Sequence, residues 1–416
     1  MRRLLVVACL LSWAPVTLGA PEPTTSVINH TLEIAVWYDG PTTSLEPLHR
    51  VSSAFLQTHR DVAVNLRRHA TITAYPLLTR WTTIGAAEAP DLVVISGSWL
   101  AQFKDAFAPL DLLARGAAAQ QIVPPALELF TLDGHLWAVP WGVAGRVLLV
   151  RSDLLAEKQL QAPQTWEQVA EVAAALHDPP KRYGLGLPGG DGRGGATLLQ
   201  EMIWAEGDAV LDPGGTVDLT GEAKLRALER YTALAESAQP EILTWSQTEL
   251  ESLFAAGRLG MMVTDTWAAR SWQGLQGIPA FQVLPLPGGK QPIGHLLGDG
   301  LAVFGRSKER ALAKAFAESV LLAPSQQKLV EWGGLQVQQE LLAAKDPLLG
   351  ALLPTVAQAR IIPPFQPPAV AGALDYALQL ALSGRATASQ ALAAAQAALK
   401  GQSAPGGTPG APAGAG

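Results

Sequence analysis

The sequence predicts an α/β protein, because strand-like and helix-like segments alternate along residues 31–95. Residues 31–37 and 62–66 alternate apolar and polar side chains, which is typical of half-buried strands. Between these strands and the next, residues 45–59 and 75–84 repeat apolar side chains at helical spacing. Leu92-Val93-Val94-Ile95 is an unbroken apolar run closed by Ser96-Gly97-Ser98, and such a run predicts a buried parallel strand.

The middle of the chain is predicted to be mostly helical. Thr165, with Gln168 three residues later, forms a capping box that predicts a helix start. Further helices are expected over residues 224–237, over 250–256 with an end at Gly257, and from Ser307 to about residue 322; residues 259–263 predict a short strand. Residues 189–195 are rich in glycine but contain no GxxxxGK[ST] pattern, so we expect a flexible loop rather than a phosphate loop.

Residues 1–20 have the features of a secretion signal. Arg2 and Arg3 precede a short apolar core, residues 4–11, and residues 17–20 offer small side chains for cleavage. The only cysteine, Cys9, lies in that core with almost no hydrophobic stretch before it, so lipid anchoring through Cys9 is not expected. We expect a mature chain that starts near Ala20 or Pro21, has no cysteine, and is secreted across the cytoplasmic membrane to the periplasm or outer cell surface.

Length, composition and charge limit the number of domains and the kind of partner. The chain has 416 residues, enough for two domains, and is 48% hydrophobic, enough for a large core. The formal net charge is −6, which disfavours nucleic acid or an anionic membrane as the main partner. Residues 401–416 are almost entirely Gly, Pro, Ala, Ser and Thr, and are expected to form a disordered tail.

Tryptophan is unusually placed. Of 12 Trp residues, 11 lie beyond the leader, and six of these stand beside Gly, Pro or polar residues where a strand or helix should end: Trp37, Trp99, Trp141, Trp204, Trp267 and Trp332. A flat ring with one N–H donor suits ligands with an apolar face and polar edges, of which sugars are the commonest. Core packing is the alternative role for any single one of them.

Several segments, taken in order, resemble the extracytoplasmic solute-binding proteins of ABC importers, in the sugar-binding branch that includes maltose-binding protein. Each piece is degenerate, but their order and spacing are specific, and together they cover nearly all of residues 30–400. The segments are residues 32–39, Ala89-Pro90-Asp91 with the strand to Trp99, residues 136–154, Pro163-Gln-Thr165-Trp166, residues 254–267, residues 284–302 and the helix pair at 307–325.

The resemblance implies two α/β lobes joined by a hinge, with the ligand in the cleft between them. The first lobe would comprise residues 31–140 and 299–340, and the second residues 141–298 and 341–400. The resemblance also implies partners: a small sugar ligand and the membrane permease subunits of an importer. We expect a monomer without a cofactor. None of the seven His shows HxxxH or HExxH spacing, so a zinc site is not expected either.

Matching segment to segment, the resemblance places ten residues in the cleft. Trp267 corresponds to a stacking tryptophan, and Arg146, at a crossover, is expected to form a structural ion pair rather than a ligand contact. The segment at residues 41–43 and Ser98-Trp99 lack the charges that maltose-binding protein carries there, so a sugar held by stacking and neutral donors is expected. The ten are Trp37, Asp39, Ser98, Trp99, Trp141, Thr197, Trp204, Trp267, Asp299 and Trp332.

Two other functions stay open from sequence. Polyamine binding needs several carboxylates near aromatic rings, and Asp39, Asp265 and Asp299 could supply them. A secreted glycoside-acting enzyme needs two facing carboxylates, which no motif specifies. No GxSxG elbow is present, which disfavours an α/β-hydrolase, and we expect a binding protein rather than an enzyme.

Overall fold

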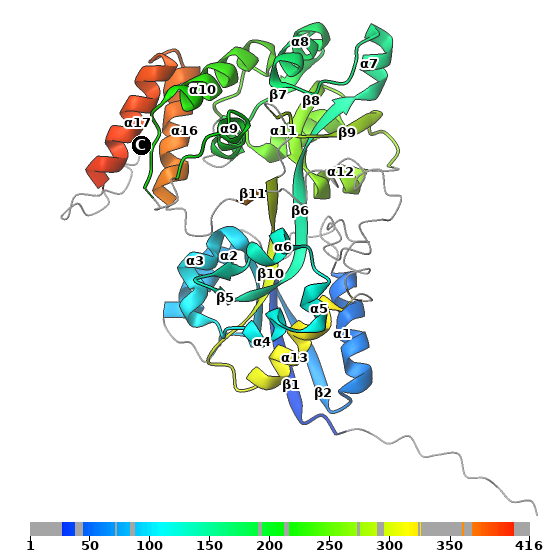
Figure 1. Cartoon of the computed structure of the whole chain (residues 1–416). Coiled ribbons are helices and arrows are strands. Elements are labelled where there is room, and N and C mark those ends of the chain that lie inside the picture. The colour runs from blue at the N-terminus through cyan, green and yellow to red at the C-terminus, as the bar shows by residue number, and fades with distance from the viewer. Residues whose placement is uncertain are drawn as a thin grey trace, which may run out of the picture.

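The chain forms two lobes, one above the other in Figure 1, connected by long strands. The computed structural model describes residues 27–37, 45–70, 73–83, 88–189, 194–211, 216–272, 275–288, 295–322, 325, 360–361 and 368–402, without the side chains of a few of them, Trp141 included. The predicted leader at 1–20, Asp39, Trp332 and most of the predicted tail lie outside these residues. The α/β prediction and the two-lobed architecture are both confirmed.

The first lobe is built on a sheet in the order β2-β1-β3-β10-β6. Strand β1 (His30–Trp37) lies parallel to both β2 (Val62–His69) and β3 (Leu92–Ser96), with Ile34 opposite Leu66 and Leu92. Helices α1 (Glu46–Thr58) and α13 (Arg310–Leu321) pack together through the Phe55 and Phe316 rings, whose centroids are 5.2 Å apart. Helix α2 (Ala74–Thr83) buries Leu78 and Trp81 in the same core.

Short elements fill the chain between β3 and the second lobe, where the sequence predicted no structure. They lie in the lower lobe in Figure 1, and the two small strands pair antiparallel. They are η2 (Gly97–Trp99), α3 (Leu100–Phe103), η3 (Lys104–Ala106), α4 (Asp111–Ala114), α5 (Ala117–Gln120), α6 (Pro124–Glu128), β4 (Thr131–Leu132) and β5 (His135–Leu136).

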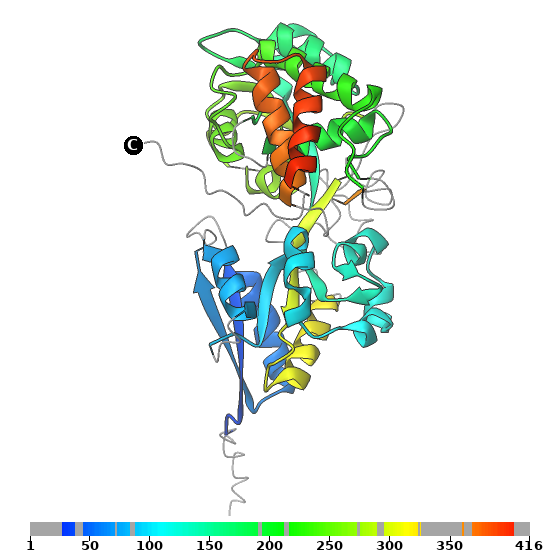
Figure 2. The same ribbon diagram turned by 90° about the vertical axis from the view of Figure 1, so that its left-hand side faces the viewer.

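Two long strands run from one lobe into the other. Strand β6 (Ala138–Arg151) pairs antiparallel with β10 through its first half and with β8 and β9 through its second half. Strand β10 (His295–Val303) pairs with β6 and, from Asp299 onward, with β3 of the first lobe. Figure 2 shows β10 passing between the lobes in yellow. The proposed lobe boundaries, at 140/141 and 298/299, therefore fall within these two crossing strands.

The second lobe continues the same sheet through β6, β8 and β7, with β9 beside β6. Side chains alternate along β6, so Leu148 and Val150 face one core while Val147 and Leu149 face the other side of the sheet. The elements are α7 (Ser152–Lys158), α8 (Trp166–Leu176), β7 (Tyr183–Gly186), α9 (Gly194–Ala205), α10 (Glu222–Leu234), η4 (Ala235–Ser237), α11 (Gln247–Ala255), β8 (Leu259–Asp265), α12 (Thr266–Trp272), β9 (Phe281–Pro285), β11 (Arg360–Ile361), α16 (Pro368–Leu382) and α17 (Ala388–Gln402).

Local signals predicted several boundaries correctly. The Thr165 hydroxyl accepts a hydrogen bond from the Gln168 amide at 3.3 Å, so the predicted helix start is confirmed. Gly257 follows α11 with φ of +75°, a conformation that favours glycine at a helix end. Helix α11 begins earlier than predicted, because Ser246 and Glu249 form a capping box of their own.

Other boundaries were wrong. The predicted loop at 189–195 gives way to α9 at Gly194, and the helix predicted from Ser307 begins at Arg310. The Ser307 hydroxyl instead accepts from the Glu309 amide ahead of the helix, at 3.0 Å. The predicted tail starts too early, since α17 continues to Gln402. Within the part of the chain that the structure describes, no helix has the length and apolar character needed to span a bilayer.

Candidate ligand-binding cleft

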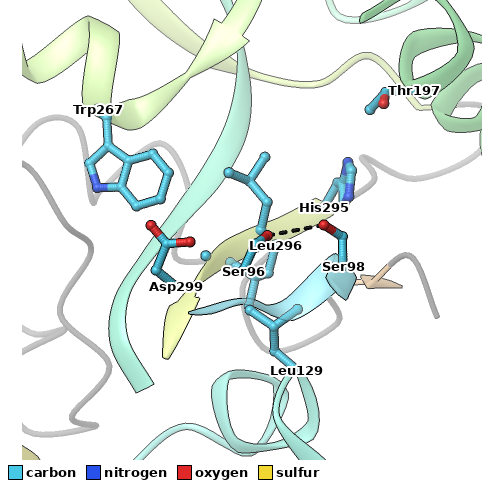
Figure 3. A pocket seen from close by; sticks show the side chains of 10 residues that line it. Ser96, Ser98, Leu129, Thr197, Trp267, His295, Leu296 and Asp299 are labelled. Carbon is cyan, nitrogen blue, oxygen red and sulfur yellow. Dashed lines mark hydrogen bonds between the residues drawn. The ribbon is translucent and has the colours of Figure 1, made fainter. Parts of the chain in front are cut away.

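A pocket of about 270 Å³ opens between the lobes, beside the crossing strand β10. Figure 3 shows side chains converging on it from both sides. Ser96, Ser98 and Leu129 come from the first lobe, and Thr197 and Trp267 come from the second. The remaining lining residues are the first five of β10: His295, Leu296, Leu297, Gly298 and Asp299.

Trp267 is held in place by the turn from β8 into α12. The buried strand β8 ends at Asp265, whose Oδ1 accepts from the amides of Trp267 and Ala268 at 2.9 and 3.1 Å. The carboxylate therefore caps the first turn of α12 and fixes the backbone that carries the indole. Burial raises the pKa of Asp265, an effect that the cap hydrogen bonds and the charge of Arg146 offset in part. Nε1 of Trp267 is buried and has no hydrogen-bond partner among the described residues.

Asp299 is the one carboxylate among the described residues that line the pocket. It stands between Gly298 and Gly300, where larger residues do not fit. A Cβ at position 298 would lie 2.5 Å from the Gly142 carbonyl oxygen, and one at position 300 would lie 2.6 Å from the Phe130 ring. Burial raises the pKa of Asp299 to about 6, and no cationic neighbour offsets it.

Two serines line the pocket on the β3 side, where Ser96 pairs with Asp299. Ser96 ends β3 and Ser98 lies in the helical turn η2 that follows, with 3.0 Å between their Oγ atoms. Gly97 between them is required by close packing, because a Cβ there would lie 2.7 Å from Cγ of Leu129. The predicted strand-to-loop transition at Ser96-Gly97-Ser98 thus positions two neutral hydroxyls that can each donate and accept.

Four of the ten predicted site residues line this pocket: Ser98, Thr197, Trp267 and Asp299. Trp141 is the extra residue of a β-bulge in β6, since Asp299 pairs with Gly142 while Gly300 pairs with Pro140. Its side chain, like all of Asp39 and Trp332, lies outside what the structure describes. Contact between any of these residues and a ligand stays a prediction.

The other three predicted tryptophans lie outside the pocket lining. The Trp37 indole donates to the Val94 carbonyl at 2.7 Å and stacks on Trp81 at 6.2 Å, inside the first lobe. Trp99 packs edge-on against Tyr75 at 5.7 Å. Trp204 is buried and meets the His295 ring edge-on at 5.2 Å, one layer behind the pocket wall. The sequence showed that each tryptophan stands near the end of a strand or helix. It did not show whether the ring faces the pocket or the interior of a lobe.

Sequence reasoning missed Ser96, Leu129, His295, Leu296, Leu297 and Gly298 as lining residues. A signal was present for two of them. His295, Leu297 and Asp299 are spaced by two along a strand, which places them on one face. The ion pair predicted for Arg146 is confirmed: its Nε donates to Oε1 of Glu201 at 3.0 Å, and both side chains are buried. Among the described residues, no group of three or more His, Cys, Asp or Glu could hold a metal ion.

Comparison with known proteins identifies the family. The family described as bacterial extracellular solute-binding protein matches residues 43–327, which is more than half of the chain. The chain belongs to this family. The fold agrees: this solute-binding protein superposes on maltose-bound MalE3 of T. maritima with a TM-score of 0.77 and 20% identity, covering 90% of this chain and 100% of that one.

Curated relatives match the chain at about a quarter identity, some over only part of their length. A putative binding protein of Brucella abortus (strain 2308) is 26% identical over 195 residues, 45% of this chain and 47% of the relative, so the match spans about half of each. The mannitol-binding protein of Pseudomonas aeruginosa is 26% identical over 391 residues, covering 84% of this chain and 88% of that protein.

Proposed function

We propose that this protein is the substrate-binding component of an ABC importer, which captures a sugar, sugar alcohol or oligosaccharide outside the cytoplasm and delivers it to a membrane permease. The observation that carries the proposal is the composition of the interlobe pocket. An indole, one carboxylate and three hydroxyl side chains converge on it, and among the described residues no Lys or Arg lines it. A ring face with surrounding neutral hydrogen-bonding groups matches a polyhydroxylated ligand. The relatives named for mannitol and maltose support the same ligand class.

A ligand that bridges the cleft would change the arrangement of the two lobes, and the permease could detect that change. A ligand that touches Trp267 or Thr197 in one lobe and Ser96 or Ser98 in the other would favour the closed arrangement, because only that arrangement makes both sets of contacts. The crossing strands β6 and β10 are the connections about which the lobes would rotate. The permease would then distinguish loaded from empty protein by the relative position of its lobes.

The alternatives gain less support from the geometry. Asp265 caps α12 and does not line the pocket, so Asp299 is the one described carboxylate available to a polyamine, which carries several charges. A glycoside-acting enzyme requires a second facing carboxylate, and the described lining supplies only Asp299. We therefore propose binding without turnover.

The test is a thermal-shift screen of the mature protein against D-mannitol, ribitol, maltose, maltotetraose and spermidine. A ligand at about 100 times its Kd stabilises the folded state by about 2.7 kcal/mol, which raises the melting temperature measurably. We expect a sugar or sugar alcohol to stabilise the protein. Chromatography after prolonged incubation should then recover that ligand unchanged. Stabilisation by spermidine alone would contradict the sugar assignment, and hydrolysis of maltotetraose at an enzyme-like rate would contradict a pure binding role.

A further inference from the structure

A buried cluster of three charged or titratable side chains, one from each of three elements, extends inward from the pocket wall at His295. Glu201 of α9 accepts through the same oxygen, Oε1, from Nε of Arg146 at 3.0 Å and from Nδ1 of His295 at 2.6 Å. Arg146 belongs to β6 and His295 to β10, the two strands that cross between the lobes. A single carboxylate of the second lobe thus fastens both crossing strands.

The chemistry of the partners determines the tautomer of His295. Burial would raise the pKa of Glu201, but the charge of Arg146 and the hydrogen bonds from His295 and Arg146 lower it, so Glu201 is an acceptor only. Nδ1 of His295 must then carry the proton that is donated to Oε1. In the neutral ring the second nitrogen, Nε2, has a free lone pair and accepts hydrogen bonds.

The surroundings hold the His295 ring at the pocket wall. Trp204 packs edge-on against the His295 ring, with the planes at 88°, and the His295 side chain is only 2% exposed. His295 nevertheless lines the pocket, and Nε2 has no hydrogen-bond partner among the described residues. Thr197, also in the lining, lies one helical turn before Glu201 on α9. The same helix face therefore holds the ring and borders the ligand space.

We propose that His295 determines ligand specificity by accepting a hydrogen bond from a ligand hydroxyl at Nε2, and that Glu201 is the positioning residue that fixes its tautomer. This inference rests on the proposed function, since a sugar or sugar alcohol supplies the hydroxyl donor. Arg146 neutralises Glu201 and holds it in place. The arrangement also connects ligand contact to both crossing strands, because His295 and Arg146 share one oxygen.

The first experiment needs no ligand and uses the mature protein with 15N-labelled histidine. Long-range proton–nitrogen spectra at pH 8 should show His295 with Nδ1 protonated and Nε2 unprotonated, its signals assigned by their loss in His295→Phe. Glu201→Gln, which lacks the charge but keeps the shape, should shift His295 toward the other tautomer or a mixture. A wild-type ring protonated at Nε2, alone or together with Nδ1, would overturn the proposal.

The second experiment measures affinity by calorimetry for D-mannitol, ribitol, maltose and maltotetraose. His295→Phe keeps a ring beside Trp204 but no acceptor, and should weaken the sugar that binds wild type by about tenfold. Glu201→Gln should weaken it less. The matched control is His135→Phe, whose ring bonds Asp111 at 2.7 Å in the first lobe and should leave affinity unchanged.

The outcomes separate the two proposals. Wild-type affinity in folded His295→Phe would overturn the specificity role while leaving sugar binding intact. If no sugar or sugar alcohol of the thermal-shift screen binds wild type, the sugar assignment fails, and the tautomer measured without ligand still decides whether Glu201 positions the ring. Should His295→Phe not fold, the Nε2 resonance of the wild-type protein is followed during titration with the sugar that binds. A shift at saturation supports the contact, and an unchanged resonance contradicts it.

Discussion

Trp267 of the second lobe points toward Asp299 of the crossing strand β10, so the indole and the carboxylate border the same space (Figure 3). A different local feature fixes the backbone at each residue. The cap formed by Asp265 positions Trp267, and the close packing at the two flanking glycines positions Asp299. A ring face beside an acceptor without a cationic partner suits a ligand with an apolar face and hydroxyl groups at its edge.

Replacing Trp267 with Ala should weaken sugar binding at least tenfold. Stacking contributes about 0.5–1.5 kcal/mol beyond the buried area, and about 1.4 kcal/mol corresponds to a factor of ten in Kd. Calorimetry with the sugar found in the thermal-shift screen measures the effect. Normal affinity in Trp267→Ala would show that the indole does not contact the ligand.

Trp272 is the matched control for this substitution because it lies on the same helix but packs internally. Its ring stacks on Phe254 at 5.8 Å with an interplanar angle of 12°, and it does not line the pocket. Trp272→Ala should lower the melting temperature of the ligand-free protein more than Trp267→Ala does, and should keep the wild-type affinity. The opposite pattern would reverse the roles of the two rings.

Sugar affinity should fall as the pH drops through about 6. The pKa of Asp299 is raised to about 6, so the carboxylate is the main form above that pH and the neutral acid below it. If ligand hydroxyls bind the carboxylate form, Kd should rise up to about tenfold per pH unit below 6. Asp299→Asn should bind more weakly and lose this dependence between pH 4.5 and 7. A persistent slope in that variant would show that Asp299 is not the group responsible.

The raised pKa of Asp299 also predicts that this residue makes the ligand-free protein less stable at neutral pH than at acidic pH. Above its ordinary pKa of 3.8, Asp299 ionises in the unfolded chain while the folded protein retains the proton up to about pH 6. The unfolded state therefore binds fewer protons over this window, and this group makes stability fall as the pH rises from about 4 to 6, with no further change above 6. Asp299→Asn should raise the melting temperature of the ligand-free protein at pH 7.5 but not at pH 3.5. Equal effects at both pH values would contradict a burial penalty.

Gly298 should be intolerant of any side chain. A Cβ at this position would lie 2.5 Å from the Gly142 carbonyl oxygen and 2.9 Å from the Val143 Cα, both backbone atoms of the paired strand. Gly298→Ala should destabilise the protein by about 1–3 kcal/mol in urea unfolding, as overpacking does. Gly372→Ala is the control, since nothing lies within 4 Å of its Cβ in helix α16, and it should stabilise by up to about 1 kcal/mol. Tolerance of Ala at position 298 would mean that β6 and β10 separate easily there.

We expect the leader to be removed on export, so that the mature chain begins near Ala20. The Arg2-Arg3 start, the apolar core at 4–11 and the small residues at 17–20 indicate cleavage near Ala20. Intact-mass measurement of the exported protein should give a chain that begins at Ala20 or Pro21. A lipid-modified Cys9 or a retained Met1 would show that this segment has a different role.

Much of the fold could be predicted because the signals are local. The alternation at residues 31–37, the apolar run at 92–95 and the Thr165 cap each report a few consecutive residues, and strands and a helix form there. The short elements between 97 and 136 escaped prediction because pieces of two to five residues are too short to show a period. Helix α9 was hidden by its glycine-rich start, because glycine has low helix propensity. A Cβ at Gly195 would lie 2.8 Å from the Pro188 carbonyl oxygen, so the chain packs too closely there for a larger residue.

The sequence by itself determined the α/β class, the alternation of elements and the type of side chain available to a sugar. Only the tertiary structure decided which of those side chains meet. Trp37 ends strand β1 and Trp267 lies just after the end of β8, yet one packs on Trp81 within a lobe and the other reaches the pocket. The physical reason is that local sequence sets the period and the end of an element. The contacts between residues far apart, such as 96 with 299 or 201 with 295, depend on how two crossing strands pair across both lobes.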